Sequence, residues 1–145
     1  MKLGYYGAEK TGVHAVNNDY PGIDTPQDLY IALQSIWCEY SCSPRLRPEW
    51  SQDNKSLGQC TITAFLAQDI FGGKVYGIPR GEGVFHCYNE ADGVIFDIAS
   101  EQFGDEKLVY DCSHEQKRED QFADAGKKER YEYLCSELHK YCSAE

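Results

Sequence analysis

No part of the sequence is long and apolar enough to cross a membrane, because a spanning helix needs about 20 consecutive apolar residues. The first segment, from Met1 to Gly7, also lacks the apolar stretch of a secretion signal and soon becomes polar. These absences exclude a membrane-spanning helix. They lead us to expect a cytoplasmic protein.

Basic residues are scarce. The chain has 14 Lys and Arg against 24 Asp and Glu, which gives a formal net charge of −10. A negative field of this size repels phosphate backbones and anionic lipid surfaces. We therefore expect no nucleic-acid partner and no membrane-surface partner. No feature of the sequence specifies an oligomeric state.

The sequence also contains no Cys-x-x-Cys pair, although it has 7 cysteines. An odd number of cysteines without a secretion signal favours reduced thiols over a disulfide framework. Cys38 and Cys42 could join Cys60, His86 or Cys87 as zinc ligands, but structural zinc sites usually use tighter cysteine pairs. We expect neither a metal nor a cofactor.

The remaining composition is that of one soluble domain. With 145 residues and 41% hydrophobic side chains, the chain is large enough to bury a core, and it shows no internal repeat. Residues 1–24 are rich in Gly, Tyr and Asn and are interpreted as an irregular N-terminal arm. Residues 25–145 are predicted to form a single α+β domain.

Hydrophobic spacing predicts three helices. The first begins at Thr25, which with Pro26 and Asp28 resembles a capping box, and runs to about residue 41. The second covers about residues 60–71 and is ended by Gly72 and Gly73. The third covers about residues 127–141.

Three β-type stretches are predicted between the last two helices. They cover residues 74–78, 83–88 and 93–98, and Asn89 together with Asp92 and Gly93 marks a hairpin turn between the last two. Residues 104–126 are polar and charged, and their pattern favours neither helix nor strand.

Cys60 is the candidate nucleophile because it stands at the predicted start of the second helix, directly after Gly58 and Gln59. The free N–H groups and the positive dipole end of a helix favour the thiolate form of a cysteine there. The same amides can stabilise an oxyanion. The alternative interpretation is that Cys60 is a small core residue.

His86 is the candidate base, and the predicted hairpin places Asp97 beside it. If Tyr88 pairs with Gly93, then His86 lies opposite Ile95, and Asp97 is a diagonal neighbour on the same face. A register shifted by two residues puts Asp97 directly opposite, whereas a shift by one sends it to the other face. The alternatives are a structural histidine and an aspartate that forms a turn.

Several segments together resemble the YunG-type family of small bacterial proteins. They are Leu57–Cys60, Asp69–Gly73, Phe85–Asn89 and Asp97–Phe103, followed by a similar tail at Arg130–Leu134. The family pattern is roughly WGQC, a helix ending in GG, HYWN and DLTxxQF. The resemblance covers about residues 27–138, and the order and spacing of the motifs are more specific than any one of them.

The resemblance implies a papain-like α+β fold, in which the nucleophile helix packs on a small antiparallel sheet. It also implies membership of the papain-like cysteine-hydrolase superfamily and a triad of Cys60, His86 and Asp97. This chain departs from the family pattern at Leu57, where the family has Trp, and at Ala99, where it has Thr. Both departures affect the packing expected around the site, but neither removes a member of the triad.

The side chain of an oxyanion donor is less well defined by the sequence. Asn54 stands six residues before Cys60, where papain-like peptidases keep a glutamine, and Gln59 directly precedes the nucleophile. Gln52 is a further option, and Asn54 is also a good loop-capping residue. We expect Asn54 or Gln59 to contribute.

The sequence thus predicts thiol-dependent hydrolysis of an amide or ester bond, as in a peptidase, amidase or deamidase, with a peptide, amide or ester as substrate. A transglutaminase-like acyl transferase shares the same order of residues and is one alternative. A binding or regulatory protein that keeps the fold without catalysis is another.

Overall fold

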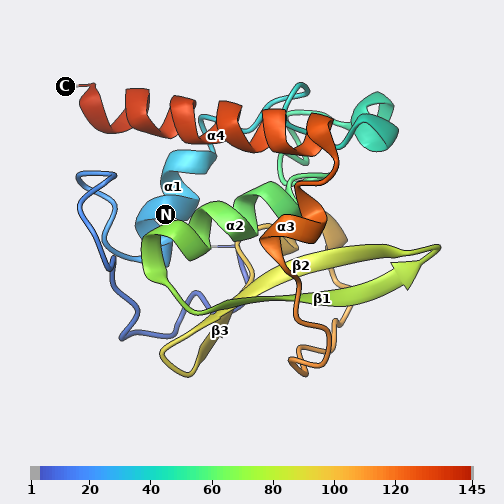
Figure 1. The fold of residues 1–145 in the computed structure, drawn as a ribbon, viewed down its shortest axis with the longest axis horizontal. Helices are drawn as coiled ribbons and strands as arrows, with labels where there is room; N and C mark the ends of the chain where they lie inside the picture. Colours follow the sequence, from blue (N-terminus) through green and yellow to red (C-terminus); the bar gives the residue numbers. More distant parts are fainter. Residues whose placement is uncertain (1–3, 145) are drawn as a thin grey trace.

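A computed structural model describes residues 4–144 of the chain. Helix α2 (Cys60–Phe71) lies between a small antiparallel sheet and the long C-terminal helix α4 (Ala125–Ser143), which gives three layers (Figure 1). The protein is therefore of the α+β class. Eight of the twelve residues of α2 are buried, because both the sheet and α4 pack against it.

The sheet contains three strands in the order β1 (Lys74–Gly81), β2 (Val84–Ala91) and β3 (Val94–Phe96). The turn between β2 and β3 consists of Asp92 and Gly93 alone, with φ angles of 53° and 78°. Positive φ at both positions is typical of a tight two-residue hairpin turn.

The predicted hairpin register was wrong. Ala91 pairs with Val94 and Asn89 with Phe96, so the strands continue past the turn that the sequence placed at Asn89. Asn89 belongs to the strand because its buried side chain donates to the Ala64 carbonyl oxygen on α2, at 2.8 Å. The displacement is an even number of residues, so every side chain keeps its predicted face.

The first helix, α1 (Pro26–Leu33), begins as predicted, with a capping box formed by Thr25 and Asp28. It ends at Leu33 and not near residue 41, so its predicted length was wrong. The Ser35 hydroxyl donates to the Ala32 carbonyl oxygen at 2.9 Å, and the chain continues in tight turns. Trp37 is nevertheless buried against α2.

Residues 4–24 contain no helix and no strand of the sheet, and they supply several core side chains. Tyr5, Val13, Tyr20 and Ile23 are buried in the main hydrophobic cluster with α1, α2 and α4. Tyr6 forms an isolated antiparallel bridge with Asp97. This segment therefore reaches the same region as the end of β3.

Part of residues 104–126, for which the sequence favoured neither helix nor strand, runs beside the sheet. Gly77 donates to the His114 carbonyl oxygen and Gln116 donates to the Val75 carbonyl oxygen, each at 2.8 Å, so this stretch runs beside β1. The short helix α3 (Arg118–Gln121) follows and leads into α4.

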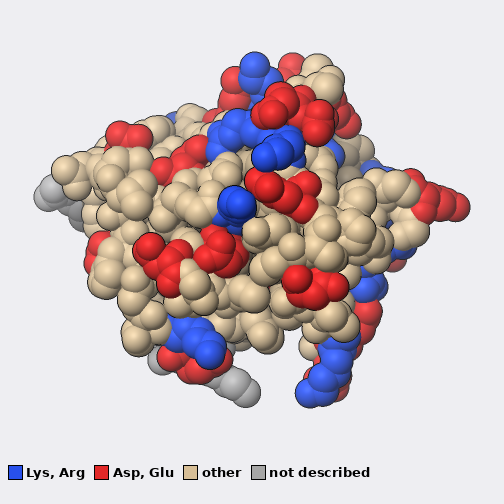
Figure 2. Space-filling model, turned by 60° about the horizontal axis from the view of Figure 1, so that its bottom comes forward, with Lys and Arg blue, Asp and Glu red and all other residues tan. Residues whose placement is uncertain are grey.

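Two short 3₁₀ helices complete the fold, η1 (Pro44–Glu49) and η2 (Ser100–Phe103). Within residues 4–144, none of the helices combines the length and apolar character needed to span a membrane. Acidic and basic side chains are intermingled on the face drawn in Figure 2.

Candidate active site

Cys60 is the first residue of α2, and its partly buried thiol lines a pocket of about 830 Å³. The loop before it turns sharply at Gly58, whose φ is 71°. A Cβ on Gly58 would lie 2.5 Å from the Cys42 sulfur, so only glycine fits here. The Gly58 N–H donates to Gln102 Oε1 at 3.3 Å, which ties the loop to η2.

His86 and Asp97 form a buried hydrogen-bonded pair next to this helix terminus. His86 Nε2 lies 2.6 Å from Asp97 Oδ2, and each side chain is only 1% exposed. His86 comes from β2, and Asp97 directly follows β3. The contact expected between the imidazole and the carboxylate is therefore present, on the face that the corrected register retains.

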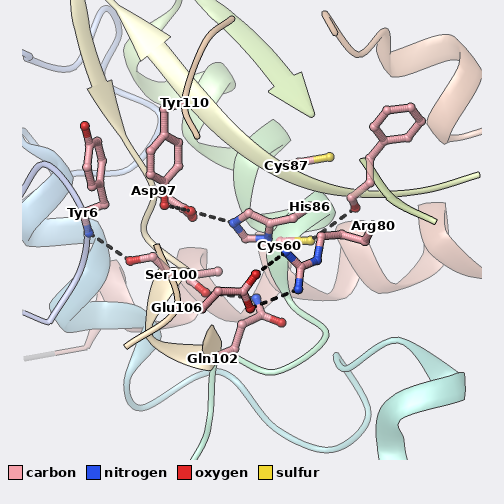
Figure 3. Close-up of polar contacts among 12 residues, drawn as sticks. Tyr6, Cys60, Arg80, His86, Cys87, Asp97, Ser100, Gln102, Glu106 and Tyr110 are labelled. Atoms are coloured by element: carbon pink, nitrogen blue, oxygen red, sulfur yellow. Dashed lines mark hydrogen bonds and ion pairs between the residues drawn. The ribbon is translucent and has the colours of Figure 1, made fainter. Parts of the chain in front are cut away.

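The second imidazole nitrogen of His86 faces away from Asp97. His86 Nδ1 is buried and has no hydrogen-bond partner among the described residues. Figure 3 shows the Cys60 sulfur on the side of the ring opposite Asp97. Phe103 holds the ring edge-on, with the two ring centroids 4.5 Å apart. The imidazole is thus fixed in orientation, with one nitrogen free for the pocket.

Tyr110 supports Asp97 from the far side. Its hydroxyl donates to the same Asp97 Oδ2 at 2.7 Å, and its ring stacks on Tyr6 with the centroids 4.0 Å apart (Figure 3). No sequence pattern pointed to this residue, because Tyr110 lies in the polar segment without a periodic pattern. The contact forms because the chain after η2 turns back toward the sheet and brings Tyr110 next to Asp97.

The charges at this site favour an ion pair. Burial lowers the pKa of His86, but the Asp97 carboxylate and the Cys60 thiolate outweigh burial and raise it to about 10. The pKa of Cys60 is held well below its usual range by a hydrogen bond from the Cys87 thiol and by the charge of His86, against the effect of burial. The hydrogen bond that the Cys87 thiol donates to Cys60 also raises the pKa of Cys87 itself. At neutral pH, thiolate and imidazolium are therefore the favoured forms.

Neither sequence-predicted oxyanion side chain joins Cys60 and His86 in the pocket. Gln59 is buried, and its Nε2 donates to the Cys38 carbonyl oxygen at 3.1 Å. Asn54 forms a loop bridge with Ser51, and among the described residues it is not part of the pocket wall. An oxyanion role for Asn54 or Gln59 stays a prediction.

The pocket wall also contains Arg80, which forms an ion pair with Glu106. Arg80 Nη1 and Nη2 lie 2.7 and 3.1 Å from the two carboxylate oxygens of Glu106 (Figure 3). The guanidinium also lies 4.8 Å from the centroid of the Phe103 ring. Within residues 4–144, no group of three or more His, Cys, Asp or Glu side chains is arranged to hold a metal ion.

These features define an α+β protein in which a cysteine at a helix N-terminus lies beside a buried histidine–aspartate pair. The chain belongs to the YunG family, whose family model matches residues 25–143. It is 36% identical over 106 residues to the "Uncharacterized protein YunG" of Bacillus subtilis (strain 168). The aligned residues make up 72% of this chain and 83% of that protein. No solved structure matches significantly.

Proposed function

We propose that this protein is a thiol-dependent hydrolase of amide or ester bonds, with Cys60 as nucleophile, His86 as acid and base, and Asp97 as the residue that orients the imidazole. The buried hydrogen bond of 2.6 Å between His86 and Asp97, next to a helix N-terminal cysteine, carries the proposal. This pairing supports a charged imidazole, which in turn stabilises a thiolate.

The reaction follows from these positions. The Cys60 thiolate attacks the substrate carbonyl carbon, and the helix geometry leaves the Cys60 backbone N–H free of an intrahelical acceptor to stabilise the oxyanion. The imidazolium of His86 gives its proton to the leaving amine or alcohol, and a thioester forms. Neutral His86 then accepts a proton from water, whose oxygen attacks the thioester. The acid product leaves, and Cys60 is restored as thiolate beside imidazolium.

Asp97 and Tyr110 act through His86 in this scheme. Asp97 Oδ2 accepts from both His86 Nε2 and the Tyr110 hydroxyl, so the proton on Nε2 is retained and Nδ1 is directed to the pocket. We include in the proposal a papain-like relation between the nucleophile helix α2 and the sheet that carries His86. The supporting features are the antiparallel sheet packed on α2 and the order Cys60, His86, Asp97 along the chain.

The proposal is tested by trapping the thioester. The protein is incubated with a panel of activated amides and esters, quenched in acid, and analysed by intact and peptide mass spectrometry. We expect an acyl adduct on Cys60 that hydroxylamine removes. Cys60→Ala should form no adduct, whereas Cys142→Ala, which removes a distant thiol at the end of α4, should behave as the wild type.

Adducts spread over the exposed cysteines, or an unchanged adduct yield in Cys60→Ala, would refute the nucleophile assignment. Product analysis with and without an added primary amine then separates the reaction type. Hydrolysis predicts the free acid as the main product, whereas a dominant amide product would replace the hydrolase by an acyl transferase.

A further inference from the structure

We propose that the end of the pocket between η1 and α4 binds an anionic oxyacid group of the substrate, a carboxylate or a phosphate, while the scissile carbonyl lies at Cys60. This inference rests on the proposed function and specifies its substrate class. The residues concerned are Arg130, Arg45 and Lys127, which line the same pocket as Cys60.

Arg130 is the most deeply buried of these three cations. It belongs to α4, is only 6% exposed, and lines the pocket. Its Nη1 donates to the Ser41 carbonyl oxygen at 3.3 Å, but its buried Nε has no hydrogen-bond partner among the described residues. A guanidinium cannot escape its charge by losing a proton in a protein. A buried cation without a counter-ion is costly, so a bound anion would complete this arrangement.

The neighbouring cations also lack an acidic partner. Among residues 4–144, no carboxylate forms an ion pair with Arg45, Lys127 or Arg130. Lys127 Nζ donates instead to the neutral Gln121 Oε1 at 2.6 Å. Arg80, which lines the same pocket, differs because both of its terminal nitrogens donate to the Glu106 carboxylate.

Two acidic residues also line the pocket, and neither forms an ion pair with this cluster, although the negative charge of Asp124 partly stabilises the Arg130 cation. Asp124 Oδ1 accepts from the Lys127 backbone N–H at 3.0 Å and so caps the N-terminus of α4. Glu82 lines the pocket from the tip of the β1–β2 hairpin, and it forms no ion pair with Arg45, Lys127 or Arg130 within residues 4–144. Because the whole protein carries a net charge of −10, an attraction for anions at this end must be local.

The chemistry of such a substrate follows directly. A planar guanidinium binds a carboxylate or phosphate through two parallel hydrogen bonds, which fixes the orientation of the substrate as well as its affinity. With the anionic group held between η1 and α4, the carbonyl to be attacked is positioned at the N-terminus of α2. The proton transfers and bond changes at Cys60 and His86 are unchanged.

Matched alkylating probes test this inference. N-iodoacetylglycine carries a carboxylate, N-iodoacetylglycinamide is its neutral counterpart, and N-iodoacetyl-aminomethylphosphonate carries a phosphonate. In each case the Cys60 sulfur bonds to the CH₂ carbon, and iodide leaves. Longer homologues (β-alanine and γ-aminobutyrate in place of glycine) vary the distance from the reactive carbon to the anion. The rate of modification of Cys60 is followed by peptide mass spectrometry.

We expect the best anionic probe to modify Cys60 about tenfold faster than its neutral amide, the factor typical of one charge-assisted hydrogen bond. Arg130→Met should abolish this preference, so that the anionic probe and its neutral amide modify Cys60 at equal rates. Lys128→Met removes an equal charge from an exposed position on α4 outside the pocket, and it should keep the preference. If Arg130→Met fails to fold, Arg45→Met and Lys127→Met should each reduce the preference.

The remaining outcomes separate the two proposals. Equal rates with anionic and neutral probes in the wild type, with Cys60 still the fastest thiol, would overturn the anion site and leave the hydrolase intact. A preference retained in all pocket variants would also overturn it. If Cys60 reacts with no probe faster than the other cysteines, both the nucleophile and the anion site are overturned. A preference for phosphonate or for carboxylate identifies which anion the site takes.

Discussion

Two histidine–aspartate pairs in this chain have similar geometry and opposite surroundings. His14 Nδ1 lies 2.8 Å from Asp24 Oδ2, with side chains 61% and 62% exposed. His86 Nε2 lies 2.6 Å from Asp97 Oδ2, with side chains 1% exposed. Water screens the first pair, and its main effect is that the hydrogen bond from His14 lowers the pKa of Asp24.

The buried pair behaves differently because solvent cannot replace either partner. Burial favours neutral His86, yet the Asp97 charge and the Cys60 thiolate raise its pKa to about 10. The comparison shows that burial, together with a second interacting group, decides what the pair does. The hydrogen-bond distance alone does not. Only the buried pair is placed to influence a nucleophile.

The largest difference between the pairs should appear in stability. Asp97→Ala leaves the His86 charge and the Tyr110 hydroxyl buried without their partner. It should lower the free energy of unfolding by about 3–5 kcal/mol, as is typical when one member of a buried ion pair is removed. Asp24→Ala removes an exposed partner and should leave the urea midpoint nearly unchanged. Similar losses in both variants, measured by urea denaturation, would contradict the distinction.

A smaller difference should appear in thiol reactivity when only the charge is changed. Asp97→Asn keeps the shape of the side chain but removes the charge that raises the pKa of His86. Less imidazolium then stabilises the thiolate, so the pKa of Cys60 should rise by about one unit, and its alkylation by iodoacetamide should slow by about tenfold at pH values below that pKa, where the thiolate is the minor form. Asp24→Asn is the matched control and should react as the wild type. An unchanged rate in Asp97→Asn would separate the pair from Cys60.

The smallest effect should come from the support of Asp97. Tyr110→Phe removes one hydrogen bond to Asp97 Oδ2 and should slow Cys60 alkylation by about two- to fivefold at pH values below the pKa of Cys60, as expected for a net contribution near 1 kcal/mol. Tyr6→Phe is the control, because Tyr6 stacks on Tyr110 and meets Asp97 only through its backbone. An equal effect of both substitutions on the alkylation rate would contradict a specific role for the hydrogen bond from Tyr110 to Asp97.

The sequence predicted helix α2 with its observed bounds, because a glycine precedes Cys60 and a pair of glycines follows Phe71. It also placed His86 and Asp97 on one face, since alternation along strands depends only on parity. The register itself was wrong, because Asn89 resembles a turn residue but is held in β2 by Ala64 on α2. That contact is long-range and leaves no local signal.

Two parts of the site that the sequence missed come from segments outside the helix and hairpin that carry the predicted residues. Tyr110 reaches Asp97 from an unpatterned stretch, and Arg130 reaches the pocket from α4, although from the sequence it was noted only as part of the family-like tail. Cys87 was considered only as a zinc ligand, although its thiol contributes to the lowered pKa of Cys60. The spacing of residues along one helix or strand predicts which side chains share a face of that element. Contacts between elements depend instead on how the layers pack.

The central claim is that Cys60 is a thiolate beside charged His86 at neutral pH. The most direct test is the pH dependence of Cys60 alkylation by iodoacetamide, followed by peptide mass spectrometry alongside the other cysteines. Because the pKa of Cys60 lies well below its usual range, its rate should change little between about pH 6 and pH 8, whereas an ordinary thiol slows about tenfold per unit below its pKa near 8.5. A Cys60 rate that falls with pH like that of an ordinary thiol would contradict the account.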